Sequence, residues 1–461
     1  MCSVTSLWIA SDIATATGGI ASAHFGVSGI AFDSREIGAG DLFVAMVGEN
    51  DDGHRFIDGA FARGAAGAIV SHPVAHPHVL VADTAAALNA LGVARRARLG
   101  KTGAAARVAG VTGSVGKTGT KEALAAALAR TPDTKVHRSV KSYNNHTGVP
   151  LSLARMPADT DYGVFEMGMN HAGEIAALTA MVRPHVALVT AIAPAHIEFF
   201  PTGLDGIADA KGEIFGGLEP GGTAIIPFDS PQRDRLIAHA KPYAARILTF
   251  GLGAGADVRA QQAVATDRGS LITATLPGAE LCFTVGQHGA HWVSNSLAVI
   301  AAVLALGGDL AVAGLALAEL EDLAGRGARY LLPSGALIID ESYNANAASM
   351  TATLQVLADE TATRRIAVLG EMRELGRESD ALHAGIAEPL LAADVDFALL
   401  VGPAMAPLAK ALEGKVDFRH VADTAVAIAT LPSIIAPGDV ILIKGSNGVG
   451  LSALVSALRN A

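Results

Sequence analysis

GVTGSVGKTGTKE, residues 110–122, contains a glycine-rich loop that ends in Gly-Lys-Thr. The apolar run ARVAGVTG leads into the loop, and KEALAAALA continues from it with the composition of a helix. In such a loop backbone N–H groups bind phosphates, the lysine reaches the outer phosphates and the hydroxyl binds magnesium. The order of strand, glycine loop and helix therefore predicts a nucleotide-binding P-loop. Its predicted nucleotide contacts are Gly113, Ser114, Val115, Gly116, Lys117, Thr118 and Gly119.

The spacing of this loop departs from the strict P-loop pattern. G-x-x-x-x-G-K-[ST] requires glycine at position 111, where this chain has Val111. A chance Gly-Lys-Thr in an ordinary turn is the alternative, and the flanking strand and helix disfavour it. The chain lacks the Asn/Thr-Lys-x-Asp motif that a GTPase uses to read its base. The loop alone thus predicts nucleotide binding and leaves the reaction open.

Composition narrows the class of protein. A chain of 461 residues with 51% apolar side chains suits about three domains of ~150 residues. Its net charge is −10 and it has no dense Lys/Arg run, so neither nucleic acid nor an anionic membrane surface is an expected partner. Two cysteines, Cys2 and Cys282, cannot form a disulfide framework. Such scarcity is typical of a reducing compartment, which predicts the cytoplasm.

Neither a signal peptide nor a membrane span is expected. Residues 1–19 have no basic segment before their short apolar run. The apolar residues 296–320 are interrupted by Gly307, Gly308 and Asp309, and their first half is too short to cross ~30 Å of hydrocarbon. We interpret this segment as two buried helices joined by a turn.

Alternating strand-like and helix-like runs predict an α/β protein of three domains. Residues 1–103 form a small N-terminal α/β domain with a parallel or mixed sheet, and the basic, glycine-bearing residues 95–106 form a linker. Residues 104–323 form a central P-loop ATPase-like doubly wound sheet. Residues 324–461 form a C-terminal Rossmann-like domain.

Three further residues of the central domain could bind metal. Glu166 ends a predicted strand, where its carboxylate can face magnesium held by phosphates. His196 follows another strand, and Lys211 lies on a helix. An ammonium repels a cation, but a lysine that has added CO2 carries an anionic carbamate, which could bind a second magnesium together with His196. From the residues alone, an ordinary surface lysine and a hydrogen-bonded loop histidine are favoured.

Segments in order along nearly the whole chain resemble the Mur ligase family. The resemblance begins at AFDSREIGAGDLFVAMVGENDDGHRF, and the family's P-loop pattern T-G-x-x-G-K-T matches residues 112–118. The other matching segments are NNHTGVPLSL, FEMGMNHAGEI, AHIEFF with AKGEIF, GQHGAHWVSNSLA, GRG with IIDESYNANAASM, VLGEMRELG and ILIKGS.

The resemblance implies an ATP-dependent, ADP-forming amide ligase that uses Mg2+, with two ions expected. Thr118 and Glu166 would bind one ion, and His196 with N6-carbamylated Lys211 would bind the second. Catalytic roles are implied for Lys117, His196, Lys211 and Arg326.

The resemblance also implies a set of nucleotide contacts outside the P-loop. Asn145 would lie by the phosphates, and His288 and Asn295 near the adenine. Arg326 and Asp340 would close over the phosphates and ribose when the C-terminal domain swings in.

The order and spacing of the segments are most similar to those of family members that act in the last cytoplasmic step of peptidoglycan precursor synthesis. The implied partners are UDP-MurNAc-tripeptide, D-alanyl-D-alanine and ATP, and the implied protein is a monomer. The N-terminal domain would bind the UDP end, and the C-terminal domain the incoming dipeptide. The implied substrate-binding residues are Ser34, Arg35, Asp52, Gly53, His54, Tyr343, Asn344 and Asn346.

Some positions depart from the family's usual pattern. His146 stands where a glutamate is usual, Glu341 where a second aspartate is usual, and Asn447 where an arginine is common. The Asp-Asn-Pro-Arg mark of the enzyme that adds diaminopimelate is absent, which favours the D-alanyl-D-alanine step. The alternatives are another Mur-type or folylpolyglutamate-synthetase-like ligase and, in a different class, a nucleotide-regulated switch.

Overall fold

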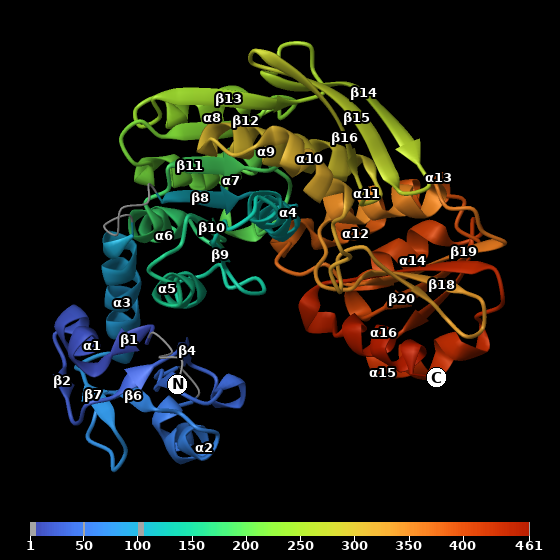
Figure 1. Cartoon of the computed structure of the whole chain (residues 1–461). Coiled ribbons are helices and arrows are strands. Elements are labelled where there is room, and N and C mark those ends of the chain that lie inside the picture. Colours follow the sequence, from blue (N-terminus) through green and yellow to red (C-terminus); the bar gives the residue numbers. More distant parts are fainter. Residues whose placement is uncertain (1–5, 49–50, 100–105, 461) are drawn as a thin grey trace.

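The computed structural model describes residues 6–48, 51–99 and 106–460. Its three large sheets each belong to one successive part of the chain, which confirms the predicted three-part α/β organisation (Figure 1). The boundary predicted between residues 103 and 104 lies outside the described residues, as does Cys2. The boundary at residues 323/324 stays a prediction and falls between the last strand of the second sheet and the first of the third.

The N-terminal domain is built on a five-stranded sheet of order β2-β7-β6-β5-β4. All its pairs are parallel except β2 with β7, so the sheet is mixed as predicted. A two-stranded ribbon, β1 with β3, lies beside it. The elements are β1 Trp8–Ile9, α1 Ala10–Thr17, β2 Ile20–Ala21, β3 Gly26–Val27, β4 Gly29–Ala31, β5 Asp41–Val44, α2 Ile57–Ala62, β6 Gly67–Val70, β7 His78–Leu80 and α3 Thr84–Arg98.

Helix α3 connects the N-terminal and central domains (Figure 1). Asp83 caps its first turn by accepting hydrogen bonds from the N–H groups of Ala85 and Ala86. The helix continues to Arg98, so the prediction that a linker begins at Arg95 is wrong. Arg95 is buried, and residues 100–105 of the predicted linker lie outside the described residues.

The central domain contains a nine-stranded sheet of order β16-β15-β14-β13-β12-β11-β8-β10-β9. The strands from β9 to β14 are parallel, and β15 is antiparallel to both of its neighbours, β14 and β16. The strands are β8 Arg107–Thr112, β9 Val136–Arg138, β10 Tyr162–Glu166, β11 Val186–Val189, β12 Thr223–Pro227, β13 Arg246–Gly251, β14 Val258–Thr266, β15 Gly269–Leu276 and β16 Ala279–Val285.

Helices cover both faces of the central sheet, which explains why its inner strands are apolar throughout. Helices α4, α9 and α10 pack in the core on one face, and α5 to α8 in the core on the other. Helix α9 ends at Gly307 in a left-handed conformation and α10 begins at the cap Asp309, which confirms the predicted pair of buried helices. The helices are α4 Lys117–Ala129, α5 Gly148–Ala154, α6 Glu174–Val182, α7 Leu204–Gly212, α8 Arg233–Ala240, α9 Ala290–Leu306 and α10 Leu310–Ala318.

The register of three inner strands positions the P-loop. β8 lies between β11 and β10, with Val189 opposite Thr112 and Glu166 opposite Val111. Because parallel strands end at the same edge, the P-loop after Thr112 lies beside the segments that follow Glu166 and Val189.

The C-terminal domain is a six-stranded sheet of order β17-β18-β22-β19-β20-β21, parallel except for β17. Helices again pack on both faces, with α11 to α14 in one core and α15 and α16 in the other. This is the predicted Rossmann-like architecture. The elements are β17 Ala328–Leu331, β18 Leu337–Glu341, α11 Ala347–Ala358, β19 Arg364–Gly370, α12 Ser379–Gly385, α13 Ala387–Ala392, β20 Phe397–Val401, α14 Ala406–Leu412, β21 Asp417–Val421, α15 Thr424–Thr430, β22 Asp439–Lys444 and α16 Leu451–Arg459.

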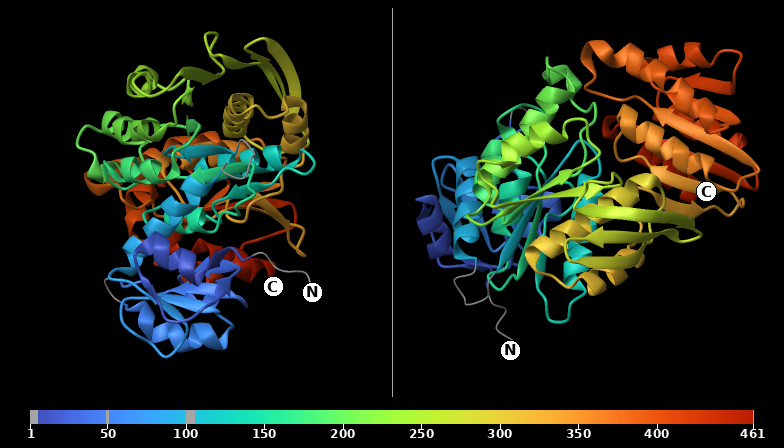
Figure 2. Two further views of the ribbon diagram at one scale, coloured as in Figure 1. Left: turned by 60° about the vertical axis from the view of Figure 1, so that its left-hand side comes forward. Right: turned by 90° about the horizontal axis from the view of Figure 1, so that it is seen from above.

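Seen from above, the two outer domains lie on either side of the central one (Figure 2, right). No helix in residues 6–48, 51–99 and 106–460 combines the length and apolar composition that a membrane crossing requires.

Candidate active site

The predicted P-loop joins the end of β8 to the start of α4. Gly113 has φ 150°, and a Cβ atom there would lie 1.9 Å from Thr190 Oγ1, so no other residue fits. Gly116 precedes α4 with φ 81°. Ser114 anchors the loop to the segment after β11, because its Oγ donates to Ala193 O at 2.9 Å and accepts the Ala193 N–H at 3.0 Å. The loop therefore has a fixed backbone shape.

Lys117 folds over the loop. Its Nζ donates to Gly113 O at 2.7 Å and to Ser114 O at 3.3 Å. Burial lowers the pKa of Lys117, Glu166 counteracts that shift, and Arg326 adds to it. An anionic phosphate would reverse this shift and replace the carbonyl acceptors, which suits a lysine that binds the outer phosphates of a nucleotide.

A chain of hydrogen bonds links the P-loop helix to the C-terminal domain. Thr118 Oγ1 donates to Glu166 Oε2 at 2.8 Å, and the other Glu166 oxygen accepts from Asn144 Nδ2 at 2.7 Å. Ser142 Oγ lies 3.1 Å from Thr118 Oγ1, and Arg326 Nη2 donates to Ser142 Oγ at 3.1 Å. Three residues predicted to act on the same nucleotide, from two domains, are thus brought together.

His196 and Lys211 both lie close enough to Lys117 for its charge to lower their pKa values. His196 has φ 58°, and its Nδ1 contacts Glu374 of the C-terminal domain. Burial lowers the pKa of His196, Glu374 counteracts that shift, and Lys117 and Lys211 add to it. Burial and the charge of Lys117 lower the pKa of Lys211 to well below its usual value. Lys211 is therefore more often neutral than an exposed lysine, and only a neutral amine adds CO2.

Protein side chains alone do not form a closed metal centre in the described parts of the chain, where no group of three or more His, Cys, Asp and Glu could hold an ion. A metal that bridges protein and nucleotide needs only a few protein ligands, because phosphates and water supply the others. The adjacent oxygens of Thr118 and Glu166 fit such an ion, since both are hard oxygen donors.

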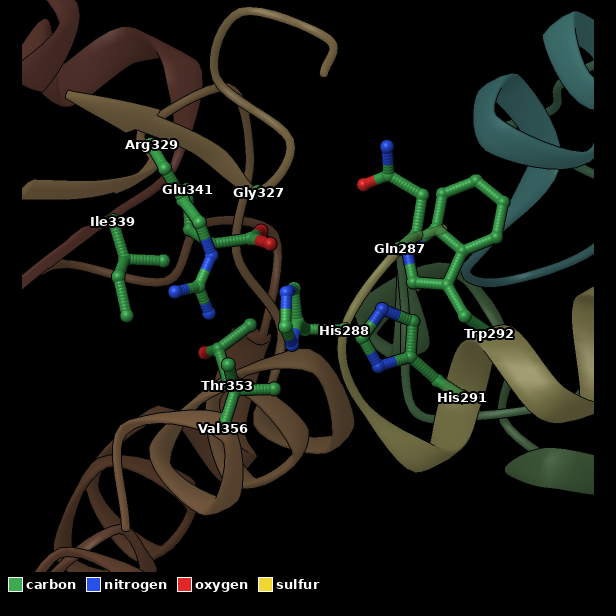
Figure 3. Close-up of a pocket in the computed structure, with 10 residues that line it drawn as sticks. All are labelled: Gln287, His288, His291, Trp292, Gly327, Arg329, Ile339, Glu341, Thr353 and Val356. Carbon is green, nitrogen blue, oxygen red and sulfur yellow. The ribbon is translucent and has the colours of Figure 1, made fainter. Parts of the chain in front are cut away.

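A pocket lies between the start of α9 and the C-terminal domain (Figure 3). His288 stands between the central-domain side chains and those of β18 and α11 (Figure 3). Trp292 also packs against the P-loop helix, because a Cβ atom at Gly119 would lie 3.0 Å from its ring. The residues lining the pocket are Gln287, His288, His291, Trp292, Gly327, Arg329, Ile339, Glu341, Thr353 and Val356.

The two predicted adenine neighbours occupy different places. His288 lines the pocket, and burial lowers its pKa, with a further contribution from Arg329. Asn295 instead lies beside the P-loop, because a Cβ atom at Gly116 would be 2.8 Å from its Oδ1. The pocket and the phosphate loop are thus neighbouring parts of one site, and helix α9 borders both.

Asp340 and Tyr343 shape the loop that carries Arg326. Asp340 is buried and accepts hydrogen bonds from the Gly325 N–H at 2.9 Å and from Ser342 Oγ at 2.6 Å. The Arg326 guanidinium stacks on the Tyr343 ring at 4.0 Å from its centroid. Both side chains are therefore engaged within the protein and fix the position of Arg326.

Asn344 and Asn346 also have local partners. Asn344 Oδ1 accepts the Ala345 N–H at 2.9 Å, and its carbonyl accepts from Lys444 Nζ at 3.0 Å. Asn346 forms a capping box with Ser349 at the start of α11. Asn145 likewise accepts the Gly148 N–H at 2.9 Å, at the start of α5. Their roles toward a substrate or nucleotide stay predictions.

In the N-terminal domain, Arg35 is exposed and pairs with Asp33, whose side chain also caps the turn that begins at Ser34. His54 Nε2 accepts the Ser71 N–H at 2.9 Å, so its Nδ1 carries the proton and donates to Asp52 at 2.6 Å. Gly53 is needed there, since a Cβ atom would lie 2.6 Å from Met46 O. The structure thus orders the Asp52–His54 segment, and its predicted contact with a UDP group stays a prediction.

The structure shows the surroundings of the three residues that depart from the family pattern. His146 is exposed, and Glu341 accepts from the buried Lys444 at 3.3 Å. Next to Asn447, Arg373 donates to Gly448 O at 2.9 Å. An arginine side chain from another loop therefore contacts the residue that follows Asn447.

Sequence reasoning missed Ser142, Glu374 and Arg329 as site residues. Each meets the site across a domain boundary or a pocket, and no local motif signals such a contact. Asn144 was part of the quoted Asn-Asn segment, and its contact with Glu166 follows from the position of that segment beside β10.

Models of three protein-family domains match the chain. The Mur ligase family catalytic domain matches residues 26–130, the Mur ligase middle domain residues 111–303, and the Mur ligase glutamate ligase domain residues 325–447. A curated relative from Escherichia coli (strain K12) is named UDP-N-acetylmuramoyl-tripeptide--D-alanyl-D-alanine ligase. It is 36% identical to this chain over 96% of the length of each.

Solved structures are similar over the whole chain as well. A crystal structure of MurF from Acinetobacter baumannii has a TM-score of 0.85 at 32% identity, covering 98% of this chain and 99% of that one. The MurF ligase from Thermotoga maritima in complex with ADP has a TM-score of 0.77 at 26% identity, covering 94% and 97%.

Proposed function

This chain belongs to the Mur ligase family, and from that premise we propose that it is the ATP-dependent ligase that adds D-alanyl-D-alanine to UDP-N-acetylmuramoyl-tripeptide. The observation that carries the proposal is a P-loop facing Arg326 of another domain, in a chain 36% identical to a ligase of that name. ADP and phosphate are the other products, and the amide completes the pentapeptide of the peptidoglycan precursor.

The reaction requires activation of a carboxylate. A carboxylate and an amine do not condense at useful rates in water, so the γ-phosphoryl group of ATP first moves to the terminal carboxylate of the tripeptide. The amine of D-alanyl-D-alanine then attacks this acyl phosphate and phosphate leaves. The first step brings two anions together, so positioned positive charge is the main catalytic device. Lys117 of the P-loop and Arg326 of the C-terminal domain would supply it.

Magnesium fits the oxygen pair of Thr118 and Glu166, and in that position it would neutralise phosphate charge. His196 and Lys211 fit a second ion only if Lys211 carries a carbamate, and the lowered pKa of its buried amine favours that modification. Arg326 stays fixed on Tyr343 while the nucleotide binds, and closure of the C-terminal domain excludes water from the reactive acyl phosphate.

The substrates divide among the domains. The UDP end of the sugar nucleotide binds near the ordered Asp52–His54 turn and Arg35, and adenine binds in the pocket lined by His288. D-alanyl-D-alanine approaches from the loop that carries Tyr343. We expect the enzyme to act as a monomer in the cytoplasm, where these nucleotides are made.

An ADP-release assay with each component omitted in turn tests the proposal. We expect ADP only when ATP, magnesium, UDP-MurNAc-tripeptide and D-alanyl-D-alanine are all present. ADP release without the dipeptide would favour a nucleotide-regulated switch. Release with another amino acid in its place would favour a different Mur-type or folylpolyglutamate-synthetase-like ligase.

A further inference from the structure

Residues 139–144, hereafter the junction segment, contact all three domains. In the N-terminal domain, Glu36 accepts from Lys141 Nζ at 2.6 Å and from the Tyr143 hydroxyl at 3.1 Å. In the central domain, the segment contacts Thr118 through Ser142. In the C-terminal domain, it contacts Arg326, again through Ser142. One hydroxyl therefore touches both the phosphate loop's helix and the arginine that faces it.

The hydrogen-bond directions around Ser142 are determined by its neighbours. The guanidinium of Arg326 can only donate, so Ser142 Oγ accepts from it. Thr118 uses its single hydroxyl proton on the Glu166 carboxylate, so Thr118 Oγ1 accepts from Ser142. The chain runs from Arg326 to Ser142 to Thr118 to Glu166 and ends on a carboxylate. Each hydroxyl both accepts and donates a hydrogen bond, and the resulting polarisation strengthens the adjacent hydrogen bonds of this network.

A buried lysine holds the junction segment in place. Lys121 lies on α4, one turn after Lys117, and has no exposed surface. Its Nζ donates to Ser139 O at 2.7 Å and to Lys141 O at 2.6 Å. These two carbonyls precede Ser142, so the hydroxyl is fixed relative to the P-loop helix. The left-handed conformation of Lys141, with φ 53°, turns the chain at this point.

Arg326 is therefore held from two sides. Its own domain supplies the Tyr343 ring, and the central domain supplies Ser142. Removing either partner would leave a long, flexible side chain with more conformations near the phosphate site.

We propose that Ser142 is a positioning residue that holds Arg326 of the C-terminal domain toward the P-loop, so that the arginine is in place when the phosphoryl group moves. The inference rests on the proposed function for the identity of the reaction, and on the hydrogen bonds alone for the coupling between Ser142 and Arg326. No local sequence motif indicates this role.

A double-mutant cycle on the full chain tests the proposal. The proteins are wild type, Ser142→Ala, Arg326→Ala and the double variant. If Ser142 acts through Arg326, Ser142→Ala lowers kcat about tenfold in the wild-type background, as loss of a hydrogen bond to a charged group does, with a smaller change in KM for ATP. In the Arg326→Ala background the same substitution has an effect of less than about twofold.

Two further variants separate positioning from general damage. Ser142→Thr keeps the hydroxyl and should restore kcat to within about threefold of wild type, because the donor and acceptor remain. Tyr143→Phe removes the neighbouring hydroxyl, which faces the N-terminal domain, and should leave kcat within about twofold of wild type. Equal losses for Ser142→Ala in both Arg326 backgrounds, or no loss in either, would overturn the proposal, as would failure of Ser142→Thr.

The affinity for a non-hydrolysable ATP analogue, measured by calorimetry on the same four proteins, does not depend on the acceptor substrates. If the wild-type protein fails to ligate D-alanyl-D-alanine, the proposed function is wrong. The double-mutant cycle of nucleotide affinities then still shows whether Ser142 and Arg326 are coupled. Non-additive effects of the two substitutions on affinity would support Ser142 as the residue that positions Arg326, whatever the reaction is. Additive effects would overturn that role.

Discussion

Lys211 is a buried amine whose surroundings disfavour its charge. Burial and the neighbouring Lys117 lower its pKa well below the usual value, and no carboxylate within the described ranges forms an ion pair with it. A buried ammonium without a partner would be destabilising, so a neutral or carbamylated lysine is the form that this environment accepts.

We expect Lys211→Ala to lower kcat by ~100-fold, which is the upper end of the range of losses caused by removing a residue that supports a metal site. Millimolar acetate or a similar short carboxylic acid should restore part of the activity, because it can supply the missing anionic oxygens. ADP release measures both effects. Lys241→Ala, which removes an exposed lysine, is the matched control. Full activity of unsupplemented Lys211→Ala would contradict a carbamate role.

His185 gives the central domain a pH-dependent stability. Its Nδ1 accepts the Val108 N–H at 3.0 Å, and burial, with help from Arg96 and Arg107, lowers its pKa to about 4. The unfolded chain therefore binds a proton at this residue near pH 6.5, while the folded chain does so only near pH 4. The stability from the neutral residue is present above pH 6.5 and is lost as pH falls toward 4.

The free energy of unfolding should accordingly decrease over this window by on the order of 1 kcal/mol for each pKa unit, less what solvent screening removes. His185→Gln keeps an acceptor for the Val108 N–H and cannot titrate, so its urea midpoint should depend less on pH than that of wild type. The difference in slope between the two proteins isolates His185 from the carboxylates. Parallel slopes would show that His185 does not titrate in this way.

At the scale of elements, α3 caps a helix of the next domain. Arg96 Nε donates to Val182 O at 2.7 Å and its Nη2 to Arg183 O at 2.5 Å, where α6 ends. These carbonyls have no partner within α6, so the guanidinium supplies their hydrogen bonds. Its positive charge also interacts favourably with the negative end of the helix dipole. Burial lowers the pKa of Arg96 to about 10, which still leaves it charged at neutral pH.

Arg96→Met should destabilise the protein by about 2 to 4 kcal/mol, because two buried carbonyls lose a charged donor. Arg98→Met on the same helix removes a partly exposed pair with Asp12 and a cation–π contact with the Trp8 ring at 5.1 Å, and it should change stability by about 1 kcal/mol, less than Arg96→Met. Urea unfolding followed by circular dichroism measures both. Similar midpoints for the two variants would mean that the cap does not contribute.

The sequence predicts those elements whose signals are local. β8, the P-loop and α4 follow from a short apolar run, glycines and a helical composition, and α9 and α10 from apolar runs separated by Gly307 and Asp309. β14 to β16 do not follow, because most residues of β14 are exposed and the strand lacks the apolar run that marks the inner strands. The linker prediction failed because Arg95 and Arg96 look like solvent-exposed residues until their partners in space are known.

The same distinction applies to the site. Lys117, Thr118 and Glu166 stand at ends of strands or starts of helices, positions that patterns locate well. Ser142 and Glu374 enter the site through packing between domains, which one sequence does not encode locally.

At the scale of the whole molecule, the C-terminal domain meets the central domain at two places around Lys117. One is the contact of Arg326 with Ser142, and the other joins His196 to Glu374. Near the second contact, a Cβ atom on Gly376 would lie 2.7 Å from the Glu198 Cβ, so the two loops are in close contact. Together these contacts favour the arrangement in which the arginine faces the P-loop.

Glu374→Ala should shift the protein toward more open arrangements by up to about 1 kcal/mol, equivalent to about a fivefold change in the ratio of open to closed forms. Small-angle X-ray scattering of the nucleotide-free protein should then show a larger radius of gyration. Glu378→Ala, an exposed carboxylate in the same loop, is the control. Identical scattering for wild type and Glu374→Ala would mean that this contact does not hold the domains.

The length of α3 has a consequence for which substrates can react. Its 15 residues span ~22 Å, and the contact of Arg96 with α6 fixes it to the central domain. Trp8 of β1, whose Nε1 donates to Ala154 O, ties the rest of the N-terminal domain to the central domain. Under the proposed function, in which the N-terminal domain binds the UDP end, α3 sets the distance between that end and the phosphate site of the central domain. A precursor with one amino acid fewer would end ~3.5 Å short of the phosphoryl donor, so we expect UDP-MurNAc-dipeptide to bind without being phosphorylated.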